Sequence, residues 1–309
     1  MALHLIPRSL IYVEAVSEHG SIQAASRAIG VSASAIDRQI VLLEERAGVQ
    51  LFERRTTGMA LSAAGEVFVV LARRWRSDES RVWSDVKHLQ GVDTGHIRIV
   101  TMDSLVNGPI PRFLARIGER YPRVRIDVEI ASPDQAFTDL DTGVADIALA
   151  FNLRPHRDIH VIWSEELPLF CVVSPSHDLA GAKNTKLQEA IAYPLVLQSR
   201  SLAIRRILEA RYAWLFSDNR PPVVTNSLQL LKHLVASGGH VALTSEFDAA
   251  QELLDGKLKA IPLVDLGLSV QNICVAISSR RTLPRICRIV MEELAAEMST
   301  VLTEVRATS

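Results

Sequence analysis

Residues 21–66 read SIQAASRAIGVSASAIDRQIVLLEERAGVQLFERRTTGMALSAAGE, and this stretch decides the fold of the N-terminal part. The serine that opens it is a typical helix N-cap, and Gly30 ends the short helix expected over 22–29. Ser32 then caps a longer helix that runs to about Ala47. A helix, a tight glycine turn and a second helix form the helix-turn-helix pattern, in which the second helix lies in the DNA major groove.

The longer helix has an apolar side and a polar side. At about 100° per residue, Ile36, Ile40 and Leu43 fall within one arc, and we expect them to face the core. The opposite arc includes Ser34 and Arg38. This polar arc therefore remains available for contact with a duplex.

Two short extended runs, 49–53 and 59–62, follow the longer helix and predict a two-stranded wing. Arg54 and Arg55 lie at its tip. Such a pair in isolation is more often a solvated loop tip. Next to a helix-turn-helix it indicates contacts to phosphates or to the minor groove. A further helix is expected ahead of this region, over 9–17.

From Ser9 to Glu66 the chain resembles the N-terminal domain of LysR-type transcriptional regulators. The resemblance rests on the GS-x-x-x-AA core, the R-Q-I-x-x-LE run, the G-V-x-LF-x-R turn and the L-S-x-x-G start of the next helix. It implies a winged helix-turn-helix that binds double-stranded DNA. The DNA-contacting residues implied are Ser21, Gln23, Ser32, Ser34, Asp37, Arg38, Arg54 and Arg55.

The sequence departs from the family pattern where bases are read. Ala33 stands where a glutamine is usual, and Asp37 stands where a serine is usual. Ala33 can offer only an apolar contact, for example to a thymine methyl group. Asp37 can accept a hydrogen bond from cytosine N4 or repel a phosphate.

A long amphipathic helix is expected over 63–90, because this stretch lacks proline and repeats apolar residues every seven positions. Its own domain or a second copy of the chain could cover the apolar stripe. A helix of about 26 residues spans about 39 Å and projects beyond so small a domain, which favours a partner helix. The resemblance also implies dimerisation here, in a dimer or tetramer, through Phe68, Trp75, Val82 and Leu89.

Residues 91–309 alternate strand and helix patterns, which predicts α/β structure with parallel strands and crossover helices. One large sheet or two smaller ones fit this order equally well. Strands are expected over 97–101, 124–130, 147–151, 169–173, 195–198, 223–225, 241–244 and 270–277. Helices are expected over 105–120, 133–142, 201–215, 227–236 and 283–302.

The LysR resemblance continues in this part, with I-P-R-F-L-x-R-x-x-x-x-YP-x-V over 110–124 and L-x-x-G-x-x-D-I-A-L-A over 140–150. It implies an effector domain of two lobes that resemble periplasmic binding proteins. Lobe one would comprise 95–164 and 267–309, and lobe two 165–266. The whole chain then divides into a mainly α winged helix-turn-helix domain (1–65), a linker helix for dimerisation (66–90) and an α/β effector-binding domain (91–309).

A small-molecule effector is expected between the lobes, beyond the carboxyl ends of the strands. The strand ends there carry neutral hydrogen-bonding groups, which suits a polar or anionic effector bound partly through helix N-termini. Helix capping is the alternative role for Ser104, Ser132 and Ser227. The expected effector residues are Thr101, Ser104, Ser132, Gln198, Ser199, Thr225 and Thr244, with Asn226 beside them.

Composition limits the other possibilities. A hydrophobic fraction of 48% and a charged fraction of 22% are typical of a globular protein. The net charge of −1 gives no general attraction for nucleic acid, so DNA binding must depend on local side chains. The longest uncharged stretch, 266–279, is shorter than the roughly 18 residues of a membrane span, and no secretory signal is visible. We therefore expect a cytoplasmic protein with no membrane partner.

Catalytic and metal-binding patterns are absent from the sequence, which has no G-x-S-x-G, glycine-rich phosphate loop, H-E-x-x-H or C-x-x-C. His156 and His160 have metal-ligand spacing, but Pro155 indicates a solvated loop there. The three cysteines lie in apolar stretches and suit reduced core thiols.

We therefore expect a non-enzymatic transcriptional regulator without metal or cofactor, whose DNA binding responds to a small molecule. The alternative is a soluble ligand-binding protein or enzyme of binding-protein fold that uses its N-terminal part only to dimerise.

Overall fold

The computed structural model describes residues 5–55, 58–213, 223–264 and 271–308. Two compact units form: the first is built mainly from the chain up to Gly95, and the second from most of the remainder. Among the described residues, no helix is both long and apolar enough to cross a membrane.

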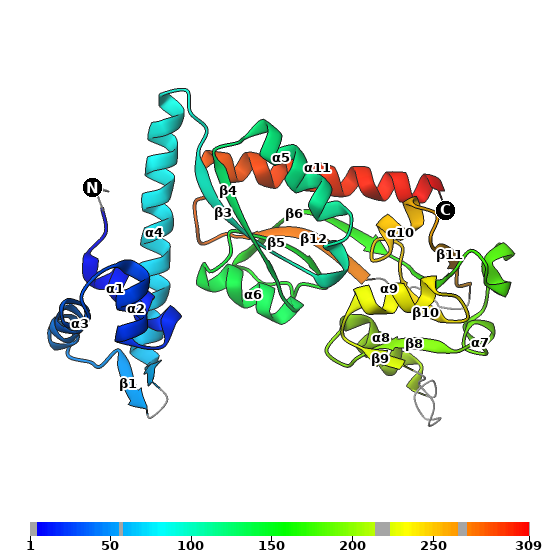
Figure 1. The fold of residues 1–309 in the computed structure, drawn as a ribbon, viewed down its shortest axis with the longest axis horizontal. Helices are drawn as coiled ribbons and strands as arrows, with labels where there is room; N and C mark the ends of the chain where they lie inside the picture. The colour runs from blue at the N-terminus through cyan, green and yellow to red at the C-terminus, as the bar shows by residue number, and fades with distance from the viewer. Residues whose placement is uncertain (1–4, 56–57, 214–222, 265–270, 309) are drawn as a thin grey trace. The chain divides into compact units, whose positions relative to one another are not determined.

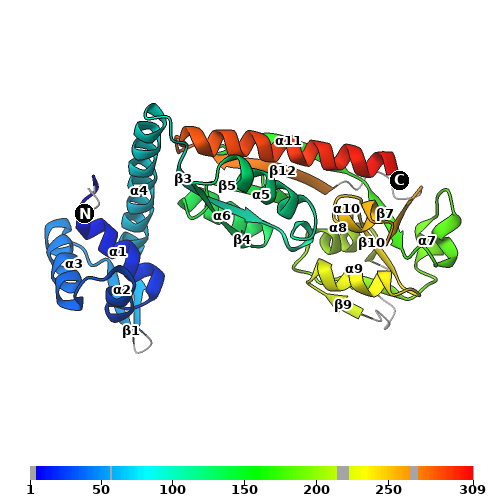
Figure 2. The ribbon, with the colours of Figure 1, turned by 45° about the horizontal axis from the view of Figure 1, so that its top comes forward.

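Helices dominate the first unit (Figure 1 and Figure 2), and local signals set their ends. The Ser21 side chain accepts a hydrogen bond from Ala24 N at 3.1 Å, and Ser32 accepts one from Ala35 N at 3.4 Å. Gly20 and Gly30 adopt left-handed conformations that end the two preceding helices. The elements are α1 (Arg8–His19), α2 (Ile22–Ile29), α3 (Ala33–Ala47), β1 (Phe52–Arg55), β2 (Gly58–Leu61) and α4 (Ala63–Leu89).

The core of this unit is where the amphipathic pattern of α3 placed it. Ile36 and Ile40 are buried, and Leu43 is half-buried against the same cluster. Buried Glu14 on α1 pairs with Arg76 on α4 at 2.8 Å, which ties these two helices together. The other buried residues of the cluster are Tyr12, Val13, Ala15, Val16, Ala25, Leu51, Phe52 and Val69.

The first strand of the wing begins at Phe52, three residues later than the sequence predicted, whereas the second begins at Gly58, one residue earlier. The Glu44 carboxylate accepts hydrogen bonds from the amides of Leu51 and Phe52 at 2.6 and 3.2 Å. A methyl group at Gly65 would come within 2.0 Å of the Leu51 carbonyl oxygen, so only glycine permits this close approach. The glycine of the L-S-x-x-G pattern thus has a packing role.

The second unit contains two five-stranded sheets, which settles the alternative that the sequence left open. The first has the order β4-β3-β5-β12-β6 and the second β11-β7-β10-β8-β9. The first comprises β3 (Gly95–Thr101), β4 (Val124–Ile130), β5 (Ile147–Phe151), β6 (Ile159–Leu167) and β12 (Gln271–Ser278). The second comprises β7 (Leu169–Val173), β8 (Leu195–Gln198), β9 (Val223–Thr225), β10 (Val241–Ser245) and β11 (Lys259–Pro262).

The predicted parallel strands are present, but each sheet also contains antiparallel strands. In the first sheet, β3 and β5 are parallel, but β12 runs antiparallel to both β5 and β6. In the second sheet, β8 is parallel to β9 and β10, but β7 runs antiparallel to both β10 and β11. The sequence analysis also missed β6 and β11. Both are edge strands with exposed polar positions, so they lack the continuous apolar run of a central strand.

Helices cover both faces of each sheet. In the first, α5 and α11 lie on the face opposite α6 (Figure 1), and Arg120 on α5 pairs with Glu293 on α11 at 2.8 Å. In the second, α7 and α8 pack on one face, and α9 contacts the other through β7, β8 and β10. The helices are α5 (Pro109–Arg120), α6 (Pro133–Thr142), α7 (Leu187–Ala190), α8 (Ala203–Arg211), α9 (Leu228–Ala236), α10 (Ala250–Leu254) and α11 (Arg285–Thr308).

Three predicted helices differ in their limits. α5 begins at Pro109 instead of 105, because a 3-10 turn over Asp103–Leu105 and Gly108 with φ of 134° precede it. α11 continues to Thr308, past the predicted end at 302, and stays apolar on its inner side through Val301, Leu302 and Val305. The end of the helix predicted over 201–215 lies outside the described residues.

Candidate functional site

A surface hollow of about 460 Å³ in the first unit joins α2, α3 and the wing. The wing reaches it because Met59 N donates a hydrogen bond to Gly20 O at 2.8 Å, which fixes β2 against the turn between α1 and α2. The hollow is lined by Ser21, Ile22, Gln23, Ala33, Ser34, Asp37, Arg55, Gly58 and Met59. Five residues predicted to contact DNA are therefore brought to one place from separate segments.

The remaining predicted DNA contacts lie near this hollow or in the wing. Ser32 and Arg38 are exposed on α3 but are not among the lining residues. Arg54 pairs with Met59 in the β1–β2 ladder, and its side chain lies outside the described part. Ser21 and Ser32 each use an oxygen lone pair to cap a helix. The Ser21 hydroxyl keeps its proton for donation to a phosphate, and the Ser32 hydroxyl also lies 3.5 Å from that of Ser34.

Arg55 is the described cation of the hollow. Its guanidinium pairs with Glu53 at 2.9 Å, and the two side chains are 60% and 57% exposed. Because exposed pairs of this kind contribute little, a phosphate can replace Glu53 as the partner of Arg55.

A second hollow, of about 620 Å³, lies along the C-terminal half of α3, where it carries Glu44 and Glu45. These carboxylates repel a phosphate backbone. The charges on α3 thus favour approach of DNA to its N-terminal half.

The helix α4 exposes an apolar face. Trp75 and Val82 are 39% and 40% exposed, and Leu89 is 86% exposed. Phe68 differs from the other predicted dimerisation residues, because it is half-buried against the core of its own unit. Val67, Val70, Trp83 and Val86 are also exposed on α4.

The second unit holds a pocket of about 420 Å³ at the strand ends of both sheets. Loops that follow β3, β4, β8 and β9 form most of its wall. The lining residues are Met102, Asp103, Ser104, Ile130, Ala131, Ser132, Pro133, Phe151, Gln198, Ser201, Leu202, Ile204, Asn226, Ser227, Leu228, Asp248 and Gln271.

The structure places Ser104, Ser132 and Gln198 of the predicted effector set in this wall, with Asn226 beside them. Ser132 also caps the start of α6, since its hydroxyl accepts from Gln135 N at 3.3 Å. Ser227 caps α9 in the same way, accepting from Leu230 N at 3.3 Å. The capping alternative therefore holds for these two serines, although both also line the pocket.

The other four predicted effector residues do not line this pocket. Thr101 and Thr244 are fully buried, and Thr244 donates to Asp248 at 2.9 Å. The Ser199 hydroxyl lies 2.6 Å from that of Ser201, and Thr225 accepts from Ser227 N at 3.0 Å. Polar residues at strand ends can thus point into the core or bond to their own loop.

Four polar lining residues were not predicted from the sequence: Asp103, Ser201, Asp248 and Gln271. Asp248 and Gln271 follow or begin strands far apart in the chain, and Gln271 Nε2 donates to Asp248 Oδ2 at 2.9 Å. Asp103 lies two residues after Thr101, where the predicted strand ends. Its position at a strand end could therefore have marked it as a candidate for the pocket wall. No Lys or Arg is among the residues that line the described pocket.

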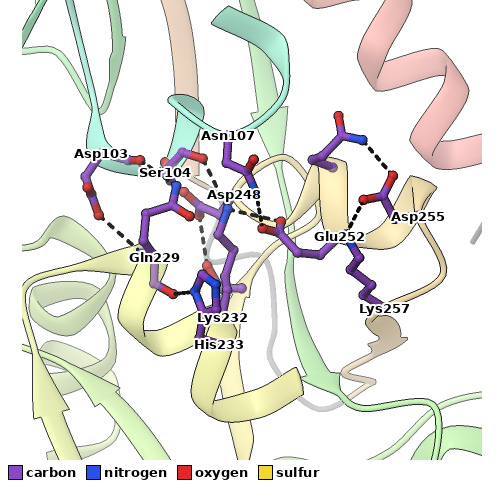
Figure 3. Close-up of polar contacts among 12 residues, drawn as sticks. Asp103, Ser104, Asn107, Gln229, Lys232, His233, Asp248, Glu252, Asp255 and Lys257 are labelled. Carbon is purple, nitrogen blue, oxygen red and sulfur yellow. Dashed lines mark hydrogen bonds and ion pairs between the residues drawn. The ribbon is translucent and has the colours of Figure 1, made fainter. Parts of the chain in front are cut away.

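A buried polar cluster beside the pocket joins the β3–α5 loop to α9 and α10 (Figure 3). Lys232 Nζ lies 3.0 Å from Glu252 Oε2 and donates to the Ser104 carbonyl oxygen at 3.4 Å. Asn107 donates to the other Glu252 oxygen at 2.8 Å. Lys232 is only 1% exposed, so this cluster fixes the loop of one sheet against helices of the other.

The cysteines are buried and form no disulfide, as their apolar surroundings predicted. Burial raises the pKa of Cys171 to about 12 and that of Cys274 to about 11. Within the described residues there is no group of three or more His, Cys, Asp and Glu side chains that could hold a metal ion.

A winged helix-turn-helix with an exposed polar hollow, joined through a long helix to a two-sheet domain with a pocket, defines a DNA-binding regulator that responds to a ligand. The family model of bacterial regulatory helix-turn-helix proteins of the LysR family matches residues 7–66, and the LysR substrate-binding domain matches residues 90–299. The chain therefore belongs to the LysR family of transcriptional regulators.

Known relatives agree with this assignment. The transcriptional regulator BbuR of Bordetella bronchiseptica is 26% identical, over 93% of this chain and 88% of its own. PtxR of Pseudomonas aeruginosa is 29% identical, over 82% of this chain and 81% of its own. The solved structure of full-length CbnR in complex with its target DNA has the same fold, with a TM-score of 0.58 at 21% identity, over 94% of this chain and 99% of that one.

Proposed function

We propose that this LysR-family regulator contacts DNA bases with the N-terminal half of α3 and binds phosphates with the wing. The observation that carries the proposal is the hollow that gathers Ser21, Gln23, Ser34, Asp37 and Arg55. Hydroxyls, an amide and a guanidinium in one concave surface are the groups that bind base edges and phosphates. The similar fold of CbnR, whose structure was solved with its target DNA, supports DNA as the partner.

The functional regions follow from this proposal. Residues 1–65 bind DNA, the helix of 66–90 dimerises the protein, and 91–309 bind the effector. Trp75, Val82 and Leu89 form the contact with a second copy, because a continuous exposed apolar face on a helix is stabilised by burial against another. The two DNA-binding domains of such a dimer require two half-sites on the DNA, separated by whole turns of the duplex.

The pocket of the second unit is the effector site in this proposal. Its volume of about 420 Å³ and its mixed polar and apolar wall suit a small molecule. Effector binding would change how the two sheets pack on each other, and so change the distance between the DNA-binding heads. Because DNA is its partner and its relatives are named transcriptional regulators, we infer a non-enzymatic, cytoplasmic protein.

The test is fluorescence anisotropy with duplex DNA from the region upstream of the gene, at several salt concentrations. We expect Arg38→Ala and Arg55→Ala to weaken binding and each to reduce the slope of log K against log salt by about one. Arg46→Ala is the matched control, because it removes the same charge from the last turn of α3, away from the N-terminal half that is proposed to contact DNA. Equal slopes for all three variants and the unchanged protein would contradict the proposed surface.

A further inference from the structure

The pocket wall of the second unit is rich in hydrogen-bond acceptors. Gln198 is fully buried, and its Nε2 donates to the Leu243 carbonyl oxygen at 2.8 Å. This bond fixes the orientation of the amide, since a flipped amide would set two oxygens against each other. The Gln198 Oε1 atom then has no hydrogen-bond partner among the described residues. A buried acceptor without a partner costs free energy unless a ligand supplies a donor.

Asp248 adds a carboxylate to the same wall. It is 3% exposed, and its described donors converge on one oxygen, Oδ2. They are the hydroxyls of Thr244 and Ser245 at 2.9 and 2.8 Å, the Ser245 amide at 3.4 Å and Gln271 Nε2 at 2.9 Å. These bonds hold the carboxylate rigidly in place. Its second oxygen receives no donor from them and can accept one from a ligand.

Asp103 places a second carboxylate where an anionic ligand would otherwise bind. Its Oδ2 accepts from Gln229 N at 3.3 Å and from the Ser227 hydroxyl at 3.2 Å, at the N-terminus of α9 (Figure 3). Helix N-termini attract anions, but here the protein's own carboxylate already occupies that position. A ligand carboxylate would meet two like charges in the pocket and no lysine or arginine among the lining residues.

The rest of the wall is apolar, through Met102, Ile130, Phe151, Leu202, Ile204 and Leu228. A ligand that fills the pocket therefore has an apolar body as well as a polar end.

We propose that the effector of this regulator is a small organic cation, an amine or a guanidinium compound, whose N–H groups bind Asp248, Asp103 and Gln198. The ligand class rests on the proposed effector pocket. The sequence analysis expected a polar or anionic effector. The proposed ligand is polar, but it is a cation instead of an anion. The cation satisfies the acceptors of the wall, and its apolar body contacts the leucine and isoleucine side chains.

The experiment uses the full-length protein, isothermal titration calorimetry and sets of probes that share one skeleton. Each set contains an alkyl or aryl amine, the corresponding alcohol and the corresponding carboxylate, for example 2-phenylethylamine, 2-phenylethanol and 3-phenylpropionate. We expect amines to bind and carboxylates not to bind. Asp248→Asn and Asp103→Asn should each weaken amine binding about 10-fold or more, since each removes a charged acceptor.

Asp255→Asn is the control, because Asp255 pairs with the exposed Lys257 outside the pocket and its loss should leave amine binding unchanged. Binding of carboxylates, failure of every amine, or wild-type amine affinity in both pocket variants would overturn the proposal. If the buried Asp248→Asn variant does not fold, the amine affinity of the Asp103→Asn variant alone tests the proposal. DNA binding of the same samples is measured by anisotropy, so an incorrect ligand class is distinguished from an incorrect regulator assignment.

Discussion

Lys232→Met tests whether the buried polar cluster between the two sheets is necessary for the stability of the second unit. The substitution keeps the length and apolar stem of the side chain but removes the ammonium group. Glu252, whose side chain is 9% exposed, then loses the cation at 3.0 Å, and the Ser104 carbonyl loses its donor. Removal of one partner from a buried ion pair destabilises a protein by about 3 to 5 kcal/mol.

For a unit of this size, about 1 kcal/mol corresponds to roughly 2 to 4 °C, so we expect Tm to fall by roughly 6 to 20 °C in differential scanning calorimetry. Lys257→Met is the matched control. Lys257 is 66% exposed and also pairs with a carboxylate, Asp255, at 2.8 Å. The exposed pair contributes at most about 1 kcal/mol, so this control should shift Tm only slightly.

The double variant Lys232→Met, Glu252→Gln separates loss of the pair from loss of packing. Because it removes both charges, we expect it to recover much of the stability that the single variant loses. A fall of Tm in Lys232→Met no greater than that of Lys257→Met would refute the reasoning, since it would mean that the ammonium group is not sequestered from water.

Three further predictions concern the packing of the first unit, its self-association and the thiols of the second unit. Gly65→Ala should destabilise the first unit by more than about 2 kcal/mol, because the added methyl group meets the Leu51 carbonyl oxygen; thermal denaturation followed by circular dichroism measures this. Gly118→Ala on α5 is the control, since Gly118 has open space around it and its substitution should not destabilise the protein. Trp75→Glu with Val82→Glu should shift sedimentation towards smaller species, since it places charges on the exposed face of α4; a sedimentation coefficient equal to wild type would argue against this interface. Cys171 and Cys274 should resist a thiol reagent at pH 8 in the native protein and react after denaturation, because burial raises the pKa of each thiol well above that pH; rapid native reaction would contradict their burial. The same raised pKa values predict that stability declines as pH rises above the ordinary thiol value of 9.0, where only the unfolded thiols ionise.

The sequence alone determined the helices of the first unit and their faces. Ser21, Gly30 and Ser32 act within one or two turns of the backbone, and the burial of Ile36 and Ile40 follows from helical spacing alone. Local signals of this kind do not depend on which distant segment packs against the helix. The same is true of most strands in the second unit, whose central apolar runs end at turn residues.

Tertiary structure decided how those elements combine. The alternation of strands and helices by itself fits one sheet or two, and the pairing of β12 with β5 and β6 places the C-terminal strand in the first sheet. The edge strands β6 and β11 depend on a neighbouring strand for their hydrogen bonds, which their own sequence does not indicate.

The pocket shows the same division. A shift of one residue along a strand turns a side chain to the opposite face, so Thr101 points into the core while Ser104, beyond the strand end, reaches the pocket. Asp248 and Gln271 meet because two strands from distant parts of the chain end at one place. The sequence could therefore supply the kinds of residues expected at strand ends, but only the packing of the two sheets determines which of them share one wall and what charge that wall carries.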